Sequence, residues 1–170
     1  LKDKVAIVTG AAQGIGKTIA QELAIEGVSL ALWDNDEARL NQTAKELSAS
    51  NGNVYAFNCD VSSEEEVESA LAKTIVQFGT IDILVANAGI ANPTNFLDIS
   101  ERDWSELYDI NVKGVFLCSK AVAPVLKKKK FGRIIIASSF AAIIPAIGGA
   151  AYASSKAAVA SLTRVMAAEL

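Results

Sequence analysis

The chain has 170 residues, a formal net charge of −3 and no histidine. This length favours one domain, and a hydrophobic content of 51% excludes a disordered chain. The weak negative charge creates no field that attracts nucleic acid or an anionic membrane surface, so we expect neither partner. Without histidine, His-based triads and His metal sites are excluded. We expect no metal, and acid/base chemistry has to come from Tyr, Lys, Asp, Glu or Ser.

The cysteines and the lack of a targeting signal indicate the cellular compartment of the protein. Cys59 and Cys118 each sit in an apolar stretch without a Cys-x-x-Cys motif, so we expect buried free thiols. No signal-peptide pattern and no apolar run long enough to span a bilayer is visible. We therefore expect a cytoplasmic protein.

Short apolar runs and helical patterns alternate along the whole chain. Runs rich in β-branched residues predict strands, and apolar spacing of three to four residues predicts helices. In chain order we expect strand 5–9, helix 15–26, strand 28–33, helix 37–49, strand 54–57, helix 62–78, strand 81–86, helix 101–130, strand 133–137 and helix 150–170.

Recognisable residues mark the boundaries of these elements. Gly27 is expected to end the first helix as a C-cap. Ser62 with Glu65 resembles a capping box, and Ser100 is expected to cap the long fourth helix. The remaining breaks are turn or loop signals at Asn51-Gly52, Gly79-Thr80, Asn92-Pro93, Gly132 and 142–149.

Strands without polar alternation, joined by helices, predict a parallel sheet that is covered on both faces. Alternating strands and helices favour right-handed crossovers and a doubly wound α/β sheet, the Rossmann fold, in a single domain over residues 1–170. A complete doubly wound sheet usually has at least one more strand. We therefore expect these residues to be part of a longer natural chain.

A glycine-rich turn follows the first strand, in the sequence Thr9-Gly10-Ala11-Ala12-Gln13-Gly14-Ile15-Gly16. Glycines let the backbone turn tightly and approach a pyrophosphate closely. The helix that follows points its free N–H groups at the phosphates. The turn is not a Walker A loop, because no Gly-Lys-Ser/Thr follows in register. The context of strand, turn and helix predicts a dinucleotide site.

Asp34 ends the second strand, 18 residues after Gly16 (34 − 16). A carboxylate there accepts hydrogen bonds from ribose hydroxyls and repels a 2′-phosphate, which favours NAD over NADP. No arginine stands in the glycine turn, where Gln13 lies, or directly after Asp34, where Asn35 lies. The alternative is that Asp34 only caps the next helix, and it is also possible for Asp34 to serve both purposes.

Tyr152 and Lys156 are four residues apart on the last predicted helix and share a face. A lysine ammonium beside a phenol stabilises the phenolate, which makes tyrosine a usable proton donor and acceptor. Ser138 and Ser139 end the fifth predicted strand, at the sheet edge where ligands bind in such folds. A hydroxyl there can polarise a substrate carbonyl.

These motifs together resemble the short-chain dehydrogenase/reductase family, on Thr9-Gly10-x-x-x-Gly14-x-Gly16, Asn87-Ala88-Gly89, Asn111, Ser139 and Tyr152-x-x-x-Lys156. The resemblance implies direct hydride transfer between a nicotinamide and the substrate carbon. It also implies further C-terminal strands and a substrate lid, which these residues do not include. It implies catalytic roles for Ser139, which polarises the carbonyl, Tyr152, which exchanges the proton, Lys156, which supports the tyrosine, and Asn111, which places a relay water. The implied cofactor residues are Gly10, Gln13, Gly14, Ile15, Gly16, Asp34, Asp60, Val61, Asn87, Ala88, Gly89, Tyr152 and Lys156.

Several of these residues have a structural alternative. Asp60, implied to meet the adenine with Val61, equally fits a capping role. Asn87, implied to steady the sheet beneath the cofactor, equally fits a turn. Asn111 is a poor helix former in a predicted helix, which favours a functional reason. Ser138 competes with Ser139, but the 13-residue spacing to Tyr152 (152 − 139) fits the family at Ser139.

We expect an NAD-dependent enzyme acting on a ketone or secondary alcohol. The alternatives are a 3-oxoacyl-[acyl-carrier-protein] reductase, usually an NADPH enzyme, a sugar or polyol oxidoreductase, a non-catalytic nucleotide-binding scaffold on the same fold, and a fragment that folds only within an oligomer. The helices 101–130 and 150–170 resemble those that pair in family dimers and tetramers. Small residues at Ala153, Ala157, Ala160 and Ser161 permit close packing, so we expect a homodimer or homotetramer.

Overall fold

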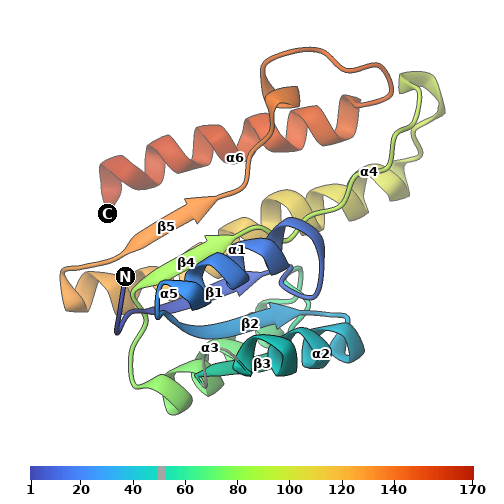
Figure 1. Cartoon of the computed structure of the whole chain (residues 1–170). Coiled ribbons are helices and arrows are strands. Elements are labelled where there is room, and N and C mark those ends of the chain that lie inside the picture. Colours follow the sequence, from blue (N-terminus) through green and yellow to red (C-terminus); the bar gives the residue numbers. More distant parts are fainter. Residues whose placement is uncertain (50–52) are drawn as a thin grey trace.

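The computed structural model describes residues 1–49 and 53–170. The described residues form a five-stranded sheet with helices on both faces (Figure 1). Every strand pair is parallel, and the order is β3-β2-β1-β4-β5. The strands are β1 (Val5–Thr9), β2 (Ser29–Asp34), β3 (Val54–Asn58), β4 (Ile83–Ala86) and β5 (Arg133–Ile136). The predicted doubly wound α/β fold is confirmed.

The strand order reverses between β1 and β4. The chain runs outward from β1 through β2 to β3, and then crosses back to place β4 on the other side of β1. In open parallel sheets a crevice forms at such a switch point, outside the carboxyl ends of the strands. The topology alone therefore places a ligand site beyond the ends of β1 and β4.

Two apolar layers hold the helices against the sheet. The helices are α1 (Gly14–Ile25), α2 (Glu37–Ser48), α3 (Glu64–Phe78), α4 (Glu101–Tyr108), α5 (Gly114–Lys129) and α6 (Ala150–Glu169). Helices α1 and α2 cover Val8 and Leu32 on one face, while α3, α5 and α6 pack with Ile7 and Leu84 on the other. Successive strand side chains point to opposite faces, so the central strands are apolar throughout because both faces are buried.

The prediction of one long helix over 101–130 is wrong in one respect. It is divided into α4, a π-helical segment η2 (Asp109–Lys113) and α5. The π segment contains Asn111, which is fully buried. A π turn inserts one extra residue and rotates the side chains that follow it. No periodicity in the sequence predicts this insertion, which places the Asn111 side chain against the backbone of Ile90.

Most of the predicted boundary signals agree with the structure. Gly27 adopts a left-handed φ of 76° after α1, Gly79 does so after α3 with 74°, and the Ser100 side chain accepts a hydrogen bond from the Asp103 N–H. Strand 81–86 is shorter, since β4 begins at Ile83. The predicted turn at Asn51-Gly52 lies outside the described residues.

One boundary prediction is wrong by one residue. The cap of α3 is Ser63, which accepts from the Glu66 N–H, rather than Ser62 with Glu65. Helix α5 runs to Lys129, and Lys130 ends it in a left-handed conformation with φ of 54°, which agrees with the predicted helix end at residue 130. Gly132 provides space after the helix, because a Cβ there would lie 2.7 Å from a Leu126 methyl carbon.

Strand β5 is the exception to the expected coverage of both faces. It is the edge strand next to β4, and Ile135 is 54% exposed. Exposure alternates along β5, with Arg133 and Ile135 outward. In Figure 1, β5 and α6 lie at one end of the layered structure and β3 lies at the other. The continuous apolar run in residues 133–137 predicted a strand that is buried on both faces. The edge strand β5 is instead partly exposed.

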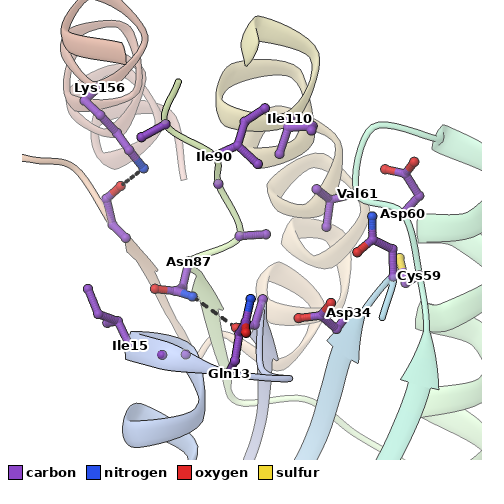
Figure 2. Close-up of a pocket in the computed structure, with 18 of the residues that line it drawn as sticks. Gln13, Ile15, Asp34, Cys59, Asp60, Val61, Asn87, Ile90, Ile110 and Lys156 are labelled. Atoms are coloured by element: carbon purple, nitrogen blue, oxygen red, sulfur yellow. Dashed lines mark hydrogen bonds between the residues drawn. The ribbon is translucent and has the colours of Figure 1, made fainter. Parts of the chain in front are cut away.

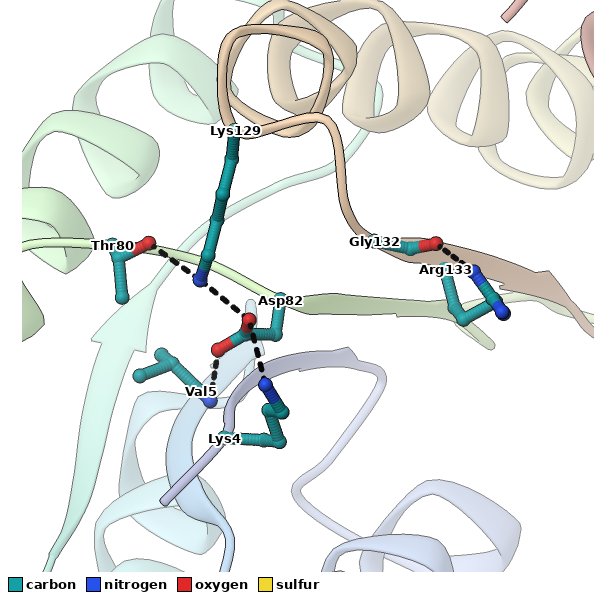
Figure 3. Close-up of polar contacts among 7 residues, drawn as sticks. All are labelled: Lys4, Val5, Thr80, Asp82, Lys129, Gly132 and Arg133. Carbon is teal, nitrogen blue, oxygen red and sulfur yellow. Dashed lines mark hydrogen bonds and ion pairs between the residues drawn. The ribbon is translucent and has the colours of Figure 1, made fainter.

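A buried carboxylate joins three elements at the edge of the sheet opposite the cleft (Figure 3). Asp82, 1% exposed, precedes β4 and accepts a 3.0 Å hydrogen bond from the N–H of Val5, which begins β1. The Nζ of Lys129, at the end of α5, donates to the other carboxylate oxygen at 2.5 Å and to Thr80 at 3.1 Å. Lys4 is a further cation, 3.8 Å away. These cations compensate the buried charge.

The two cysteines are free and buried, as predicted. Burial raises the pKa of both the Cys59 and the Cys118 thiol to about 12, which keeps them protonated at neutral pH and unreactive as nucleophiles. In the described part of the chain, no helix is long and apolar enough to cross a bilayer.

Candidate active site

A cleft of about 440 Å³ lies at the carboxyl ends of the strands, at the switch point between β1 and β4 (Figure 2). It is lined by Gly10, Gln13, Gly14, Ile15, Gly16, Asp34, Asn35, Cys59, Asp60, Val61, Asn87, Ala88, Gly89, Ile90, Ala91, Ile110, Ala137, Ser138, Tyr152 and Lys156. All thirteen residues predicted to bind the cofactor therefore face one cavity.

The glycine turn after β1 is built so that its backbone lies close to β4. Gly10 has φ of 66° and Gly14 has φ of 56°, a conformation in which other residues are strained. A Cβ on Gly16 would overlap the Gly10 carbonyl oxygen and lie 2.6 Å from the Asn87 side-chain nitrogen. Three glycines are therefore needed here for conformation and for close approach.

Asn87 and Thr9 tie the ends of β4 and β1 together. The Asn87 Nδ2 donates to the Thr9 carbonyl at 3.1 Å and to the Gly10 carbonyl at 3.4 Å. In return, the Thr9 Oγ1 accepts from the backbone N–H groups of Asn87 and Ala88, both at 3.0 Å. These bonds agree with the expectation that Asn87 steadies the sheet beneath the cleft, and they fix the position of the glycine turn.

The start of α1 fits an anionic group. Its N-cap, Gln13, makes no side-chain capping bond, and the first turn contains no acidic residue. Within the described residues, the first N–H groups, from Gly14 to Gly16, have no acceptor, as expected for the first turn of a helix. A Cβ on Gly14 would meet nothing within 4 Å, so the space beside this turn is open. Free donors at a helix start are suited to an anionic group such as a pyrophosphate.

Asp34 joins the glycine turn to the segment that follows β2. Its Oδ2 accepts from the Ala12 N–H and its Oδ1 from the Asp36 N–H, both at 3.0 Å. Helix α2 is capped by Asp36, whose side chain accepts from the Arg39 N–H. The alternative in which Asp34 caps this helix is therefore wrong. Asp34 lines the cleft and organises its rim.

Arg39 lies beside the cleft and was not predicted from the sequence. It lies in the first turn of α2, and its Nη1 donates to the Gln13 Oε1 at 3.0 Å, while its Nε is 3.4 Å from an Asp36 carboxylate oxygen. Side chains in the first helical turn lean back toward the N-terminus, which brings Arg39 toward Gln13, but no spacing in the sequence fixes this contact.

Asp60 and Val61 follow β3 and line the far side of the cleft. The Asp60 Oδ1 accepts from the Ser62 backbone N–H at 2.9 Å and from the Ser62 hydroxyl at 2.7 Å, and the Asp60 N–H donates to Glu66. Asp60 thus shapes the turn before α3 and lines the cleft, but the cap of α3 is Ser63, so the alternative in which Asp60 caps this helix is wrong. Val61 lies against Gly114 of α5, where a Cβ would be 2.7 Å from a Val61 methyl.

The opposite end of the cleft holds Tyr152 and Lys156 on one face of α6. The Lys156 Nζ lies 5.7 Å from the centre of the Tyr152 ring. Lys156 is only 4% exposed, and its Nζ donates to the Ala137 carbonyl at 2.7 Å (Figure 2). Burial lowers the pKa of the Lys156 ammonium from its ordinary value, because desolvation disfavours the charged form. A buried ammonium therefore stands beside the only phenol that lines the described cleft.

The two serines after β5 are used differently. Ser138 lines the cleft, and its hydroxyl donates to the Lys156 carbonyl at 2.9 Å. Ser139 is not among the described lining residues, and its Oγ accepts from the Ala141 N–H at 3.2 Å as it caps η3 (Phe140–Ala142). In the described part of the chain, the Ser139 hydroxyl proton has no acceptor. The role expected of Ser139 stays a prediction.

Asn111 does not line the cleft in the described structure, but it anchors a segment that does. Its Oδ1 accepts from the Ile90 N–H at 2.8 Å, and its Nδ2 donates to the Ile90 carbonyl at 2.9 Å and to the Ser155 hydroxyl at 3.1 Å. Ser155 in turn donates to the Tyr152 carbonyl at 2.7 Å. The side chain therefore connects the loop after β4 with α6, and the relay role stays a prediction.

The remaining lining residues were not predicted to bind the cofactor, although Ser138 was expected as the alternative to Ser139. They are Asn35, Cys59, Ile90, Ala91, Ile110, Ala137 and Ser138. Most of them lie beside a predicted residue at the end of a strand, so adjacency to the carboxyl ends is the signal that could have found them. Ile110 is different, because the π segment brings it to the cleft. In the described residues, no group of His, Cys, Asp or Glu side chains could hold a metal ion.

Sequence comparison places the chain among known oxidoreductases. The model of the family described as short chain dehydrogenase matches residues 4–170. The chain is 43% identical over 171 residues to the oxidoreductase UcpA of Salmonella typhimurium, covering 99% of this chain and 64% of that protein. It is 37% identical over 171 residues to a 3-oxoacyl-[acyl-carrier-protein] reductase of Synechocystis, covering 100% and 69%.

Solved structures agree with the sequence comparison. A short-chain dehydrogenase/reductase from Burkholderia phymatum, in complex with NAD, superposes with a TM-score of 0.96 at 31% identity, covering 99% of this chain and 60% of that one. An alcohol dehydrogenase from Thermococcus sibiricus, complexed with 5-hydroxy-NADP, gives 0.93 at 35% identity, covering 98% and 71%. The chain thus spans roughly two thirds of the length of its relatives.

Proposed function

The chain belongs to the short-chain dehydrogenase/reductase family, and from that premise we propose that it transfers hydride between a nicotinamide dinucleotide and the carbon of a ketone or secondary alcohol. The observation that carries the proposal is the shared cleft. One end is a glycine turn and an uncapped helix start, which suit a pyrophosphate, and the other end is a phenol beside a buried ammonium. The bound nicotinamide supplies or accepts the hydride.

Tyr152 is the residue that exchanges the proton in this reaction. Its hydroxyl donates a proton to the substrate oxygen during reduction and accepts one during oxidation. The positive charge of Lys156, held beside the ring by its bond to the Ala137 carbonyl, stabilises the phenolate that forms. Burial strengthens this interaction because water does not screen it.

The substrate oxygen also needs a hydrogen-bond donor that polarises it. Ser138 already donates its proton to the Lys156 carbonyl, whereas Ser139 accepts a backbone N–H and keeps its own proton for another acceptor. We assign the polarising role to Ser139 for this reason. For this role, the Ser139 side chain rotates about Cα–Cβ to bring its hydroxyl into the cleft. Ser138 keeps its hydrogen bond to the Lys156 carbonyl.

For the cofactor we propose NAD. Asp34 places a carboxylate at the end of β2, on the rim of the cleft, where ribose hydroxyls are bound in this fold and a 2′-phosphate is repelled. Arg39 supports a second candidate, an NADP-dependent carbonyl reductase, because its guanidinium reaches Gln13 on the same rim. Since Arg39 is also paired with Asp36, we rank NAD first and NADP second.

The proposal is tested with the full natural chain that contains these residues. A panel of ketones and secondary alcohols is assayed by the absorbance of the reduced cofactor, with NAD(H) and NADP(H) in parallel. We expect turnover with at least one substrate and a higher kcat/KM with NAD(H). Tight binding of a dinucleotide without turnover of any substrate would favour the non-catalytic scaffold. Failure to bind either dinucleotide would contradict the proposed use of the cleft.

A further inference from the structure

Ser155 is a fully buried polar residue on the helix that carries the proposed proton donor. It lies on α6 between Tyr152 and Lys156, and it is 0% exposed. It is not among the described residues that line the cleft, so we assign it no direct contact with substrate or cofactor. A buried hydroxyl lowers stability unless it is hydrogen-bonded. The hydrogen-bond partners of Ser155 therefore show what this serine does.

Ser155 connects two different elements through one hydroxyl. Its Oγ donates to the Tyr152 carbonyl at 2.7 Å and accepts from the Asn111 Nδ2 at 3.1 Å. A hydroxyl has one proton and two acceptor lone pairs, so both bonds form at the same time. The first bond stays within α6, and the second joins α6 to the π segment η2. Ser155 thus links the backbone of Tyr152 to Asn111.

The neighbouring serine makes bonds of the same kind without this link. The Ser154 Oγ donates to the Ala150 carbonyl at 2.7 Å and to the Ala151 carbonyl at 3.0 Å, and both acceptors lie in α6. Bonds from a serine to the preceding turn of its own helix are local. Replacing Ser154 removes such bonds and leaves the contact between α6 and η2 in place. The two serines therefore separate a local bond from the link between elements.

Asn111 continues the link to the loop that lines the cleft. Its Oδ1 accepts from the Ile90 N–H, and its Nδ2 also donates to the Ile90 carbonyl. There is little free space at this point, because a Cβ on Gly89 would lie 3.0 Å from the Asn111 Oδ1 and 3.4 Å from the Lys156 Nζ. Figure 2 shows Lys156 on α6 and Ile90 on the loop after β4. A shift of α6 against η2 therefore moves Tyr152 and Lys156 relative to this loop.

Bonds on the other side of α6 run to the chain that follows β5. The Ser138 hydroxyl donates to the Lys156 carbonyl at 2.9 Å, and the Lys156 Nζ donates to the Ala137 carbonyl at 2.7 Å. The turn of α6 between Tyr152 and Lys156 is thus held from two sides. On the side of the loop after β4, the bond between Ser155 and Asn111 holds it.

We propose that Ser155 is a positioning residue for Tyr152. By holding its turn of α6 against η2, Ser155 keeps the phenol of Tyr152 and the ammonium of Lys156 in fixed places beside the loop that lines the cleft. Proton transfer requires the phenol oxygen within hydrogen-bond reach of the substrate oxygen. A small displacement of a reacting group lowers the rate steeply. This inference rests on the proposed function, to which it adds a residue that acts through Tyr152.

The test compares Ser155→Ala with Ser154→Ala in the full natural chain. Alanine favours the helix, so both variants keep the fold. The substrate is the ketone or alcohol of the panel with the highest kcat/KM, and cofactor absorbance follows a single turnover at saturating substrate. For Ser155→Ala we expect this rate to fall by about 10-fold, with the KM and the dissociation constant of NAD changed by no more than about 3-fold. Ser154→Ala keeps the rate within about 2-fold, because it loses only local bonds.

A double-mutant cycle separates positioning from a general loosening of the helix. If Ser155 acts through Asn111, Ser155→Ala lowers the single-turnover rate by no more than about 2-fold in a chain that already carries Asn111→Ala. Independent effects multiply, so a further loss of about 10-fold in that background overturns the inference.

Hydrogen exchange tests the link without any turnover. The Ile90 amide donates to the same Asn111 side chain that Ser155 contacts. We therefore expect exchange at the Ile90 amide, in the protein without substrate, to accelerate by about 3-fold or more in Ser155→Ala and to stay unchanged in Ser154→Ala.

The outcomes distinguish this inference from the function on which it rests. Slower turnover together with faster Ile90 exchange, in Ser155→Ala alone, supports the inference. An unchanged turnover rate in Ser155→Ala, or an equal loss in Ser154→Ala, overturns it and leaves the proposed function standing. If the unmodified protein binds NAD but turns over no substrate, the proposed function fails. Faster Ile90 exchange in Ser155→Ala then still supports the link, and unchanged exchange overturns it.

Discussion

At the scale of single residues, Asp34 serves the fold and the proposed cofactor preference together. Both of its oxygens accept backbone N–H groups, from Ala12 and Asp36, while the carboxylate faces the cleft. Replacing Asp34 with asparagine, a neutral side chain of the same shape, tests these two roles separately. The amide oxygen of an asparagine retains one acceptor for the backbone but carries no charge to repel a 2′-phosphate.

We therefore predict that Asp34→Asn lowers the preference for NAD over NADP by about 10-fold or more, the size of one charge-assisted contact. The ratio of kcat/KM for the two cofactors measures it. Asp98→Asn, a change at an exposed acid at the end of η1 (Phe96–Asp98), serves as the control and leaves the ratio unaltered. An unchanged ratio in Asp34→Asn would restrict Asp34 to a structural role.

The sequence could predict which residues lie at the cleft where they stand beside a strand end, and their roles stay predictions. Gly10, Asp34 and Asn87 could be predicted because the carboxyl edge of a parallel sheet brings them together. Arg39 could not be predicted by spacing, because its contact with Gln13 depends on how α2 is oriented against the glycine turn. Its long side chain crosses between elements that lie apart in sequence.

At the scale of elements, the π segment η2 determines what the helix after β4 contributes to the site. It places Asn111 against Ile90, with two hydrogen bonds to that residue's backbone. The prediction of one α-helix over 101–130 missed this segment, because residues 109–113 contain neither Gly nor Pro to mark a break. Strands and caps, in contrast, follow from local residue chemistry.

Asn111→Ala is predicted to loosen the loop after β4. The substitution leaves the N–H and carbonyl of Ile90 without partners, at a cost of about 2 kcal/mol. We expect hydrogen exchange at the Ile90 amide to accelerate by about 10-fold or more, and cofactor affinity to fall because Gly89 and Ile90 line the cleft. Asn95→Ala, at an N-cap without a side-chain bond, is the control. Unchanged exchange at Ile90 would refute the anchoring role.

The junction at Asp82 connects β1, β4 and α5. Burial by itself raises the pKa of Asp82, but the hydrogen bonds from Lys129 and the Val5 N–H, with the charges of Lys129 and Lys4, lower it below its ordinary value. A carboxyl with a lowered pKa in the folded state adds stability above its unfolded-state pKa. It loses that stability as the pH falls through the folded-state value.

Asp82→Asn is therefore predicted to lower the free energy of unfolding by about 2 kcal/mol at neutral pH, where the ion pairs are formed. The difference from the unmodified chain shrinks as the solution is acidified below the folded-state pKa of Asp82. Urea titrations at neutral and acid pH measure both quantities. A destabilisation of equal size at every pH would show that the charge of Asp82 contributes nothing.

At the scale of the whole molecule, the doubly wound parallel sheet could be predicted because alternating strands and helices with right-handed crossovers leave few topologies. The exposure of β5 could not, because a run of isoleucines looks the same in an edge strand as in a central one. Burial depends on what lies beside the strand, and the sequence of the strand does not encode that neighbour.

We propose that the protein forms a symmetric oligomer through α5 and α6, where small residues allow the helices of two copies to approach closely. Ala157 and Ser161 are exposed one turn apart on α6. Ala157→Arg is predicted to yield a monomer, while Val76→Arg on α3 does not. Sedimentation velocity decides between them. A chain that is monomeric before any substitution would remove this proposal.

The central claim is that Tyr152 exchanges the proton in a cleft that binds the dinucleotide through other residues. The most direct measurement compares turnover and cofactor affinity in Tyr152→Phe, with Tyr55→Phe on β3 as the control. The predicted result is a loss of turnover of about 100-fold or more, with the dissociation constant of NAD changed by no more than about 3-fold. Turnover close to that of the unmodified protein in Tyr152→Phe would contradict it.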